Sequence, residues 1–219
     1  MSPLILAVDT THEFGSIALA RGGELLEEIK LHAPTGFAHV LYRHLAQLLG
    51  RHGVKVMDID RFAAAAGPGS FTGVRVGLAC VKGLAEAAGK PAVAVSNLQA
   101  LSTFGAAPLR AVVLDARRGE IYGAVYDQAA RLVAPETVAK FAAWLATLPE
   151  GELEFIAADF TPFRAALEGT RFARAPVVTA PGALAAAIAR LALAAVPQDP
   201  AALDANYVRR SDAELFWKE

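Results

Sequence analysis

Cysteine is nearly absent from this chain, with Cys80 alone among 219 residues. One cysteine excludes an internal disulfide and a zinc site built from several cysteines. An excess of charge of either sign is also missing, because 21 Lys and Arg residues balance 22 Asp and Glu residues to a formal net charge of −1. This balance excludes a whole-protein basic field for nucleic acid or an anionic membrane, although a local basic patch remains open.

Long hydrophobic runs are missing as well. The longest apolar stretch, residues 183–196, is rich in alanine and is interrupted by Arg190, so it falls short of the ~20 residues that a transmembrane helix needs. Residues 1–9 carry no cationic segment, and we therefore expect no signal peptide. We expect a cytoplasmic protein without a membrane partner.

What the chain does have is hydrophobic content, 54% of its residues, which is enough to bury a sizeable core. The apolar run at 4–8 predicts a buried strand, and Gly22–Gly23 predicts a hairpin turn between two further strands. The pattern over the first half predicts strands at 4–8, 16–21, 24–31, 62–66 and 91–95, and helices at 37–52, 74–88 and 98–104.

Pro108 marks the predicted boundary between two lobes, residues 1–107 and 108–219. The second half predicts strands at 111–115, 121–126 and 153–157, and helices at 135–148, 162–167 and 181–196, each with a proline at or near its start. Strand meanders followed by helices in each half predict an α/β protein of two lobes, with mixed sheets flanked by helices.

The most distinctive motif is the loop Gly67-Pro-Gly-Ser-Phe-Thr-Gly73, which joins a predicted strand to a predicted helix. Exposed N–H groups at the start of a helix favour an anion, and Arg75 adds a positive charge there. The spacing of this loop nevertheless fits neither the dinucleotide fingerprint, nor the P-loop, nor the nucleophile elbow.

Two interpretations of this loop stay open at the level of sequence. Gly67, Gly69 and Ser70 are candidate contacts to an anion or nucleotide. Alternatively, the glycines serve a tight turn and close helix packing, which Gly73 and Gly77 favour because they lie four residues apart.

Two aspartates follow predicted buried strands and are candidates for the same chemistry. Asp9, with Thr10 and Thr11 after it, could hold a Mg²⁺-bound phosphate, and Asp115 could face it across a cleft, since two carboxylates suit one hydrated cation. The alternative is that both aspartates cap turns, as aspartates at strand ends commonly do.

The histidines and the cysteine point away from a metal or a nucleophile. The five histidines lack the spacing of a metal site, and His39 and His44 are five residues apart, off a common helical face. Cys80 lies in an apolar segment of a predicted helix, so we expect it to be a buried small hydrophobe.

The predicted helices at 37–52 and 74–88 carry apolar and small residues over wide arcs. Most of these side chains are expected in the core, but a surplus face would be an interface. The candidates for such an interface are Val40, Leu41, His44, Leu48, Val74, Arg75 and Leu78.

Four segments together resemble the bacterial TsaB family, also called YeaZ. They are LILAVDTT at 4–11, AGPGSFTGVR at 66–75, VSNL at 95–98 and LDARRGEIY at 114–122, in this order. The likeness covers about the first 127 residues, and beyond it NYVRR at 206–210 is similar to a tail segment of the family.

The resemblance implies two RNase-H-like lobes of the actin, hexokinase and Hsp70 type. It also implies a part in forming N6-threonylcarbamoyladenosine at position 37 of tRNAs that read ANN codons. The resemblance further implies a non-catalytic partner of a TsaD transferase that works with a TsaE ATPase and self-associates through helices of the first lobe. The transferase carries a metal-binding H-x-x-x-H motif, which is absent from this chain.

Our leading hypothesis is therefore a scaffold or activator subunit that requires no cofactor of its own, while the complex uses ATP and Mg²⁺ and contacts tRNA through the partners. The alternative is an autonomous ATPase or phosphotransferase that uses Asp9, Asp115 and the Gly67–Gly73 loop. A metalloprotease is the weakest hypothesis. Arg117–Arg118 and Arg209–Arg210 are the candidates for a small basic patch.

Overall fold

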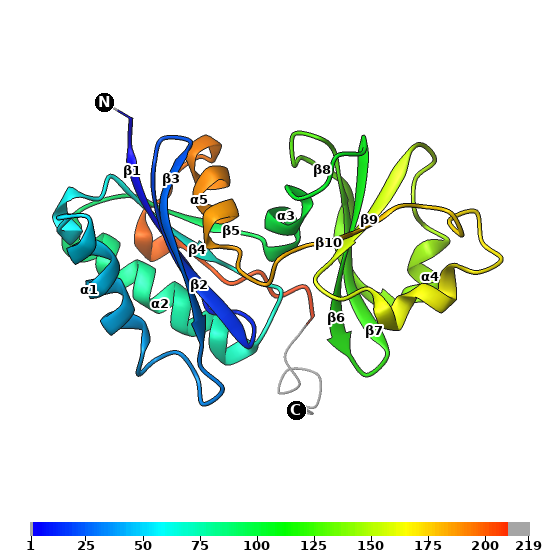
Figure 1. The fold of residues 1–219 in the computed structure, drawn as a ribbon, viewed down its shortest axis with the longest axis horizontal. Coiled ribbons are helices and arrows are strands. Elements are labelled where there is room, and N and C mark those ends of the chain that lie inside the picture. Colours follow the sequence, from blue (N-terminus) through cyan, green and yellow to red (C-terminus); the bar gives the residue numbers. More distant parts are fainter. Residues whose placement is uncertain (1, 210–219) are drawn as a thin grey trace, which may run out of the picture. The chain divides into compact units, whose positions relative to one another are not determined.

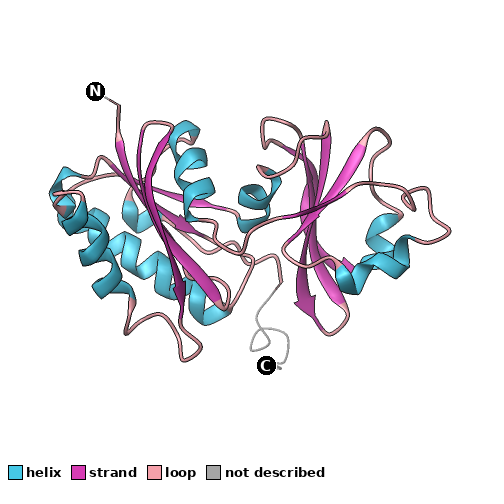
Figure 2. Ribbon diagram, in the orientation of Figure 1, coloured by secondary structure: helices cyan, strands magenta, loops and turns pink. Residues whose placement is uncertain are grey.

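The computed structural model describes residues 2–209, which form two compact units, each built on a five-stranded mixed sheet (Figures 1 and 2). Unit 1 comprises residues 2–97 and 182–206, and unit 2 comprises residues 98–181 and 207–209. The predicted boundary at Pro108 lies after the end of the first segment of unit 1, which is residue 97. Residues 182–206, which the prediction places in the second lobe, belong to unit 1. These residues return to unit 1 because their helix packs on the sheet of that unit.

The sheet of unit 1 has the strand order β3-β2-β1-β4-β5, with β1 antiparallel to β2 and parallel to β4. All five predicted strands are present, so the predicted opening meander is confirmed. The strands are β1 (Leu4–Asp9), β2 (Phe14–Arg21), β3 (Glu24–His32), β4 (Arg61–Ala65) and β5 (Ala92–Val95).

Helices cover both faces of this sheet (Figure 1), which explains why β1 is apolar at every position up to Val8. Leu4, Leu6 and Val8 pack in one core with residues of α1 (Leu41–Arg51) and α2 (Phe71–Ala88). Because successive side chains of a strand point to opposite faces, Ile5 and Ala7 point to the other face, where α5 (Ala185–Ala194) contacts β1 and β2.

Helix α1 begins at Leu41, four residues later than predicted. The preceding residues form turns instead, in which Phe37 O accepts the N–H groups of Val40 at 3.0 Å and Leu41 at 2.9 Å. The Phe37 side chain is nevertheless buried in the core, so its apolar spacing is real although its backbone is not helical.

The sheet of unit 2 has the order β10-β9-β6-β7-β8. The predicted helix at 135–148 is wrong over most of its length, because residues 132–140 form an edge strand paired with β7, and only Phe141–Leu145 is helical. Pro135 starts no helix, since an edge strand tolerates proline as well as a first helical turn does. The elements are β6 (Leu109–Arg117), β7 (Glu120–Tyr126), β8 (Leu132–Lys140), α4 (Phe141–Leu145), β9 (Leu153–Ala157) and β10 (Val177–Thr179).

An aromatic cluster forms the core on one face of this sheet. Phe141 of α4 lies 5.0 Å from Phe163 and 5.8 Å from Phe160 between ring centroids, and Phe155 of β9 lies 5.3 Å from Phe160. The predicted helix at 162–167 is a 3₁₀ helix, Thr161–Leu167. Two further 3₁₀ helices in unit 1 are Val56–Asp58 and Pro200–Ala202.

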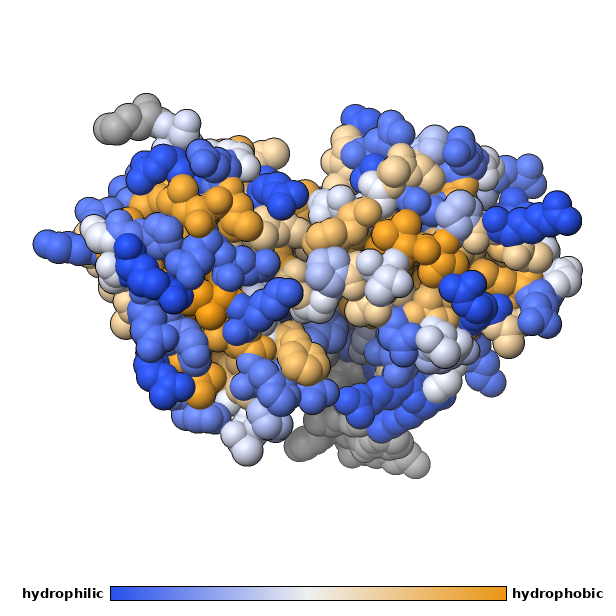
Figure 3. Space-filling view, in the orientation of Figure 1, coloured by the Kyte–Doolittle hydropathy of each residue, from blue (hydrophilic) through white to orange (hydrophobic). Residues whose placement is uncertain are grey.

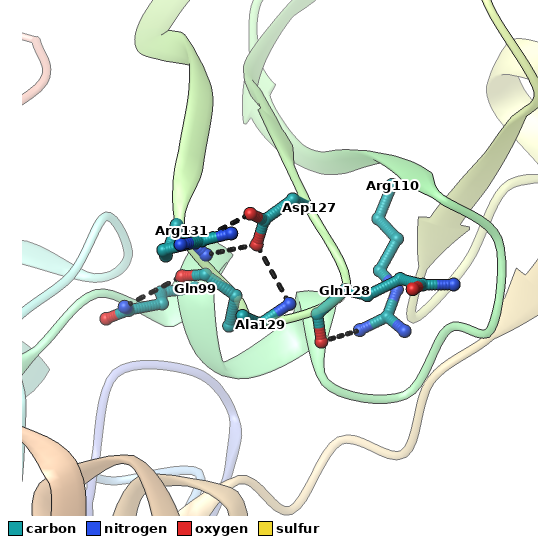
Figure 4. A network of polar contacts seen from close by, with 7 residues as sticks. Gln99, Arg110, Asp127, Gln128, Ala129 and Arg131 are labelled. Carbon is teal, nitrogen blue, oxygen red and sulfur yellow. Dashed lines mark hydrogen bonds and ion pairs between the residues drawn. The ribbon is translucent and has the colours of Figure 1, made fainter.

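Asp127 organises the loop between β7 and β8 (Figure 4). Its Oδ1 accepts the N–H groups of Ala129 at 2.8 Å and Arg131 at 2.9 Å, and its Oδ2 accepts Arg131 Nε at 2.8 Å. The hydrogen bond from the Arg131 backbone is the main cause that lowers the pKa of Asp127. Gln99 donates to Ala130 O at 3.1 Å, which ties α3 (Asn97–Ser102) to this loop.

Arg110 is a buried cation that joins α3, β6 and the same loop (Figure 4). Its guanidinium donates to the carbonyl oxygens of Ser102 at 3.1 Å, Ala107 at 3.2 Å and Gln128 at 3.4 Å. Carbonyl oxygens satisfy these donors of the buried arginine, and the bonds hold the end of α3 and the β7–β8 loop to the start of β6.

The space-filling view shows hydrophobic residues interspersed with charged ones over the face that it draws of unit 1 (Figure 3). Among the helices that the structure describes, none is long and apolar enough to span a membrane.

Candidate functional site

Asp9 ends β1 inside unit 1, with no exposed surface. Its Oδ1 accepts two hydrogen bonds from Thr11, one from the N–H at 2.9 Å and one from the hydroxyl at 2.6 Å. Within residues 2–209 its Oδ2 is buried and has no hydrogen-bond partner. The carboxyl group therefore shapes the turn that follows β1 through one oxygen and leaves the other unsatisfied.

Burial raises the pKa of Asp9 above its ordinary value of 3.8. His12 and the hydrogen bonds from Thr11 act in the opposite direction but do not overcome the desolvation of the charged form. The neutral acid is thus more favoured at this position than in the unfolded chain.

Asn97 joins this turn to the glycine loop across 86 residues of sequence. Its side-chain nitrogen donates to the Thr11 hydroxyl at 2.5 Å, and its side-chain oxygen accepts the N–H of Gly67 at 2.9 Å. The backbone N–H of Asn97 also donates to Gly67 O at 2.8 Å. Asn97 is not among the predicted site residues, whereas Thr11 belongs to the predicted phosphate contact of Asp9, Thr10 and Thr11. Both Asn97 and Thr11 lie in segments that resemble the TsaB family.

The start of α2 lies directly against the same turn. Thr11 O accepts the N–H of Ser70 at 2.7 Å, and Thr10 donates from its hydroxyl to Gly73 O at 2.7 Å. Ser70 caps the helix by accepting the N–H of Gly73 at 3.3 Å. The turn after β1 therefore occupies the space beside the first turn of α2.

Three glycines make this approach possible. A β-carbon added at Gly69 would lie 2.7 Å from Thr11 O, one at Gly73 would lie 2.0 Å from Thr10 O, and one at Gly77 would lie 2.7 Å from the Thr10 hydroxyl oxygen. Of the two interpretations of the glycines, the structure confirms close helix packing, with the β1 turn as the packing partner.

The geometry limits what the loop can do chemically. The N–H groups of Gly67, Ser70 and Gly73 all donate to acceptors of unit 1, so an anion that takes them must first displace these contacts. The anion or nucleotide contact of Asp9, Thr10, Gly67, Gly69 and Ser70 stays a prediction. Among the described residues, no group of three His, Cys, Asp or Glu side chains could hold a metal ion.

Asp115 lies in unit 2 and is exposed at the end of β6. Its Oδ1 accepts the N–H of Arg117 at 2.7 Å, which is the turn-capping role given above as the alternative for this residue. A shared cation between Asp9 and Asp115 stays a prediction.

Four of the predicted interface residues belong to the core of unit 1. Leu41 and Leu48 have no exposed surface, and Val74 and Leu78 are 3% and 6% exposed. Their assignment as contact residues is corrected, because their side chains belong to one buried cluster with apolar residues of the sheet. Helical periodicity identifies the apolar face of a helix, but it does not distinguish the side chains buried in the core from those left exposed for an interface.

The other three predicted interface residues reach the surface. Val40 and His44 are half-buried, with the His44 ring bonded to Val40 O at 2.9 Å, and Arg75 is exposed, with its guanidinium 3.5 Å from the centroid of the Phe71 ring. Tyr42 and Phe71 lie exposed on the same two helices, and the apolar spacing identifies neither of them.

Cys80 is buried, as predicted, and its pKa is raised to about 11 by that burial. The electrostatic effect of Cys80 is the main cause that raises the pKa of Tyr42, followed by burial and by a hydrogen bond with the Cys80 thiol. A thiol with this pKa is not a nucleophile near neutral pH.

Comparisons with known proteins agree on one family. The family model described as TsaD, tRNA N6-adenosine threonylcarbamoyltransferase, matches residues 32–204. The TsaB protein of Bacillus subtilis, whose name refers to tRNA threonylcarbamoyladenosine biosynthesis, is 29% identical over 224 residues and is covered to 98%, as is this chain. The TsaB protein of Escherichia coli is 36% identical over 129 residues, which span 57% of this chain and 55% of that protein.

Solved structures support the same conclusion for the fold. A Pseudomonas aeruginosa protein described as similar to peptidase YeaZ superposes with a TM-score of 0.81 at 25% identity, covering 94% of this chain and 100% of that one. Component A of (R)-2-hydroxyglutaryl-CoA dehydratase from Acidaminococcus fermentans reaches 0.53 at 10% identity, covering 88% and 98%, and shows the fold alone. The predicted fold class, two RNase-H-like lobes of actin-like type with mixed sheets, is confirmed.

Proposed function

Since this chain belongs to the TsaB family, we propose that it serves tRNA threonylcarbamoyladenosine biosynthesis as a non-catalytic scaffold or activator subunit. Its partners are a TsaD-type transferase and a TsaE-type ATPase, which together form N6-threonylcarbamoyladenosine at position 37 of tRNAs that read ANN codons. The partners supply the chemistry that uses ATP and Mg²⁺, and the contribution of this chain is a docking surface.

The observation that carries this proposal is that the turn after β1 packs against the glycine loop and occupies the space beside it. Thr10 and Thr11 occupy the space beside the first turn of α2, and the N–H groups of Gly67 and Ser70 bond to Asn97 and Thr11. N–H groups that bond within the protein, as those of Gly67, Ser70 and Gly73 do, contribute to its stability, whereas a phosphate-binding loop presents its N–H groups to a ligand. The geometry of the glycine loop therefore favours a scaffold subunit over an enzyme that turns over a nucleotide.

The docking surface that we assign comprises Val40, Tyr42, His44, Phe71 and Arg75 of α1, α2 and the residues just before α1. Tyr42 is 59% exposed and Phe71 is 45% exposed, and aromatic and arginine side chains are the types enriched in interface centres. The occupant is the TsaD-type transferase, and a second copy of this chain is the competing occupant.

Reconstitution tests the proposal. The transferase and the ATPase subunit are incubated with tRNA, ATP and a preformed activated threonylcarbamoyl donor, with and without this chain, and the modified nucleoside is quantified by mass spectrometry. The proposal expects formation only when all three proteins are present. Equal formation without this chain would refute the scaffold role.

The second candidate function, an autonomous ATPase or phosphotransferase, has one observation in its favour. The unsatisfied Oδ2 of Asp9 is a buried oxygen of the type that a cation would satisfy. Steady ATP turnover by the purified chain alone, abolished in Asp9→Asn, would establish this candidate, and the absence of ATP binding in calorimetry would remove it.

A further inference from the structure

Three connectors join the two units, at residues 97–98, 181–182 and 206–207. Relative motion is the default expectation for two units of one chain. A backbone segment that is hydrogen-bonded inside a unit moves with that unit, so the motion takes place in the few residues between the bonds of one unit and those of the other. The hydrogen bonds at both ends of each connector therefore locate the pivots.

Two of the three connectors are held at one place in unit 1, directly after β4. The N–H of Asn97 donates to Gly67 O at 2.8 Å, and the N–H of Gly67 donates to Asn97 Oδ1 at 2.9 Å. The N–H of Asn206 donates to Ala66 O at 2.8 Å. The first and third connectors, which are far apart in sequence, thus leave unit 1 from two consecutive residues. We call Ala66, Gly67, Asn97 and Asn206 the shared anchor.

The shared anchor is a fixed part of unit 1. Asn97 has no exposed surface, and its side-chain nitrogen donates to the Thr11 hydroxyl at 2.5 Å. Ala66 is also buried. Gly67 has a φ of 98° and lies so close to Asn206 that an added β-carbon would be 3.3 Å from Asn206 O. The two connectors therefore start from the same buried, hydrogen-bonded point.

On the side of unit 2, the same two connectors are held again after very few residues. Gln99 donates to a carbonyl oxygen of the β7–β8 loop at 3.1 Å, and Arg209 donates to Ala116 O at 2.8 Å. Between these bonds and the shared anchor lie Leu98 in the first connector and residues 207–208 in the third. A change of backbone torsion at these few residues reorients unit 2 while the hydrogen bonds on both sides stay in place.

The second connector is longer and is held elsewhere. In unit 2 the N–H of Ala180 donates to Ala157 O at 2.9 Å, and in unit 1 the N–H of Ala185 donates to Ser16 Oγ at 2.9 Å. Residues 181–184 lie between these bonds and include a glycine, whose backbone is freer than that of other residues. This connector can follow a rotation about the shared anchor while both of its bonds are kept.

We propose that the shared anchor is a hinge about which unit 2 moves relative to unit 1, with the second connector following the motion. Hinges are typically a few residues in loops or at the ends of elements that absorb the change in φ and ψ, and Asn97 is the first residue of α3. The Asn97 side chain is a positioning group, because it fixes Gly67, the residue next to the attachment point of the third connector. The hinge goes beyond the proposed function, which assigns a docking surface and no internal motion.

Asn97→Ala tests the hinge, because it removes both side-chain hydrogen bonds of Asn97 and keeps the backbone bond to Gly67. Thr10→Val is the matched control. It removes the buried hydrogen bond from the Thr10 hydroxyl to Gly73 O, which also ties the β1 turn to the glycine loop, but it contacts no connector. Arg209→Ala is a second variant, which releases the third connector inside unit 2 and leaves the hydrogen bonds of Asn97 in place.

The motion is measured in the full-length chain by pulsed electron paramagnetic resonance. Nitroxide labels are placed at Gln47→Cys in unit 1 and at Arg164→Cys in unit 2, both of which are exposed positions. Cys80 is buried, so the labels react at the two introduced cysteines. The width of the distribution of distances between the labels reports how far unit 2 moves relative to unit 1.

We expect Asn97→Ala to widen this distribution at least about two-fold and Thr10→Val to leave it unchanged. Arg209→Ala is expected to widen it less, because the shared anchor in unit 1 stays intact. Urea unfolding establishes that each variant is folded before the distances are compared.

An unchanged distribution in folded Asn97→Ala would overturn the hinge. Equal widening in Thr10→Val would overturn it as well, since the effect would then belong to the glycine loop in general. If Asn97→Ala does not fold, Arg209→Ala decides, and an unchanged distribution in that variant rejects the proposal. None of these outcomes depends on the transferase, so they test the hinge separately from the scaffold role.

Discussion

Gly73 and Thr10 lie so close that a β-carbon on Gly73 would be 2.0 Å from the Thr10 carbonyl oxygen. The Thr10 hydroxyl in turn donates to Gly73 O at 2.7 Å. This mutual contact closes the space between the β1 turn and α2, and the interpretation of the glycine loop as a packing element depends on it.

Gly73→Ala should therefore destabilise unit 1. The added methyl group cannot be accommodated without moving backbone on one side, and overpacking of this kind costs about 1–3 kcal/mol or more. Urea unfolding followed by circular dichroism measures the destabilisation directly.

Gly83→Ala is the matched control on the same helix. Nothing lies within 4 Å of the β-carbon that it would add, so the substitution acts only through helix propensity. It should stabilise the protein by about 0.5–1 kcal/mol. Equal effects of the two substitutions would show that α2 does not rest on the β1 turn.

The sequence predicts unit 1 better than unit 2, and the reason is local. In unit 1 the apolar run at 4–8 and the hairpin signal Gly22–Gly23 agree with the final strands, because both faces of β1 are buried by helices. In β8 the residues have no strong preference, and pairing with β7 decides their conformation. A single sequence does not contain that long-range pairing.

The candidate site shows the same limit. The glycine loop is recognisable from its spacing, but its packing partner Thr11 and the bridging residue Asn97 are 86 residues apart in sequence. Periodicity likewise does not separate the buried members of α1 from the exposed ones, so it assigns Leu41 to the interface and misses Tyr42. Which side chains a sheet covers depends on the docking angle of the helix, which the spacing does not give.

Asp9→Asn should change stability in a pH-dependent way. Burial raises the pKa of Asp9, so the unfolded chain releases this proton at a lower pH than the folded protein does. The contribution of Asp9 to stability is thus complete below its ordinary value of 3.8 and falls as the pH rises above it. Asparagine does not titrate and keeps an oxygen for the two hydrogen bonds from Thr11.

The stability of Asp9→Asn relative to the unsubstituted protein should therefore increase between pH 4 and pH 7. Urea unfolding of both proteins at several pH values measures this difference, in which the other titrating groups cancel. A difference that stays constant over this range, or that decreases, would contradict the raised pKa.

Tyr42→Arg and Leu41→Arg should separate binding from folding at neighbouring positions of α1. Tyr42 is 59% exposed, so arginine is tolerated there, and the variant should stay folded while it loses co-purification with the transferase. Leu41 is fully buried, so a charge there should cost at least about 3–5 kcal/mol and unfold unit 1. Retained co-purification of a folded Tyr42→Arg would remove this face from the proposed docking surface.

Arg61→Ala should weaken the packing of α5 on the sheet of unit 1. The Arg61 guanidinium donates to the carbonyl oxygens of Ala192, Leu193 and Ala195 at the end of α5, the last at 3.1 Å. A cation suits the negative end of a helix, and hydrogen bonds to a charged group contribute about 1.5–3 kcal/mol, so the destabilisation should fall near this range.

Amide hydrogen exchange, read by mass spectrometry, should show faster exchange in α5 than in α2. Arg190→Ala, an exposed position within α5, is the control and should leave exchange unchanged. Equal acceleration in both variants would mean that the charge of α5, rather than the cap on its end, holds the helix against the sheet.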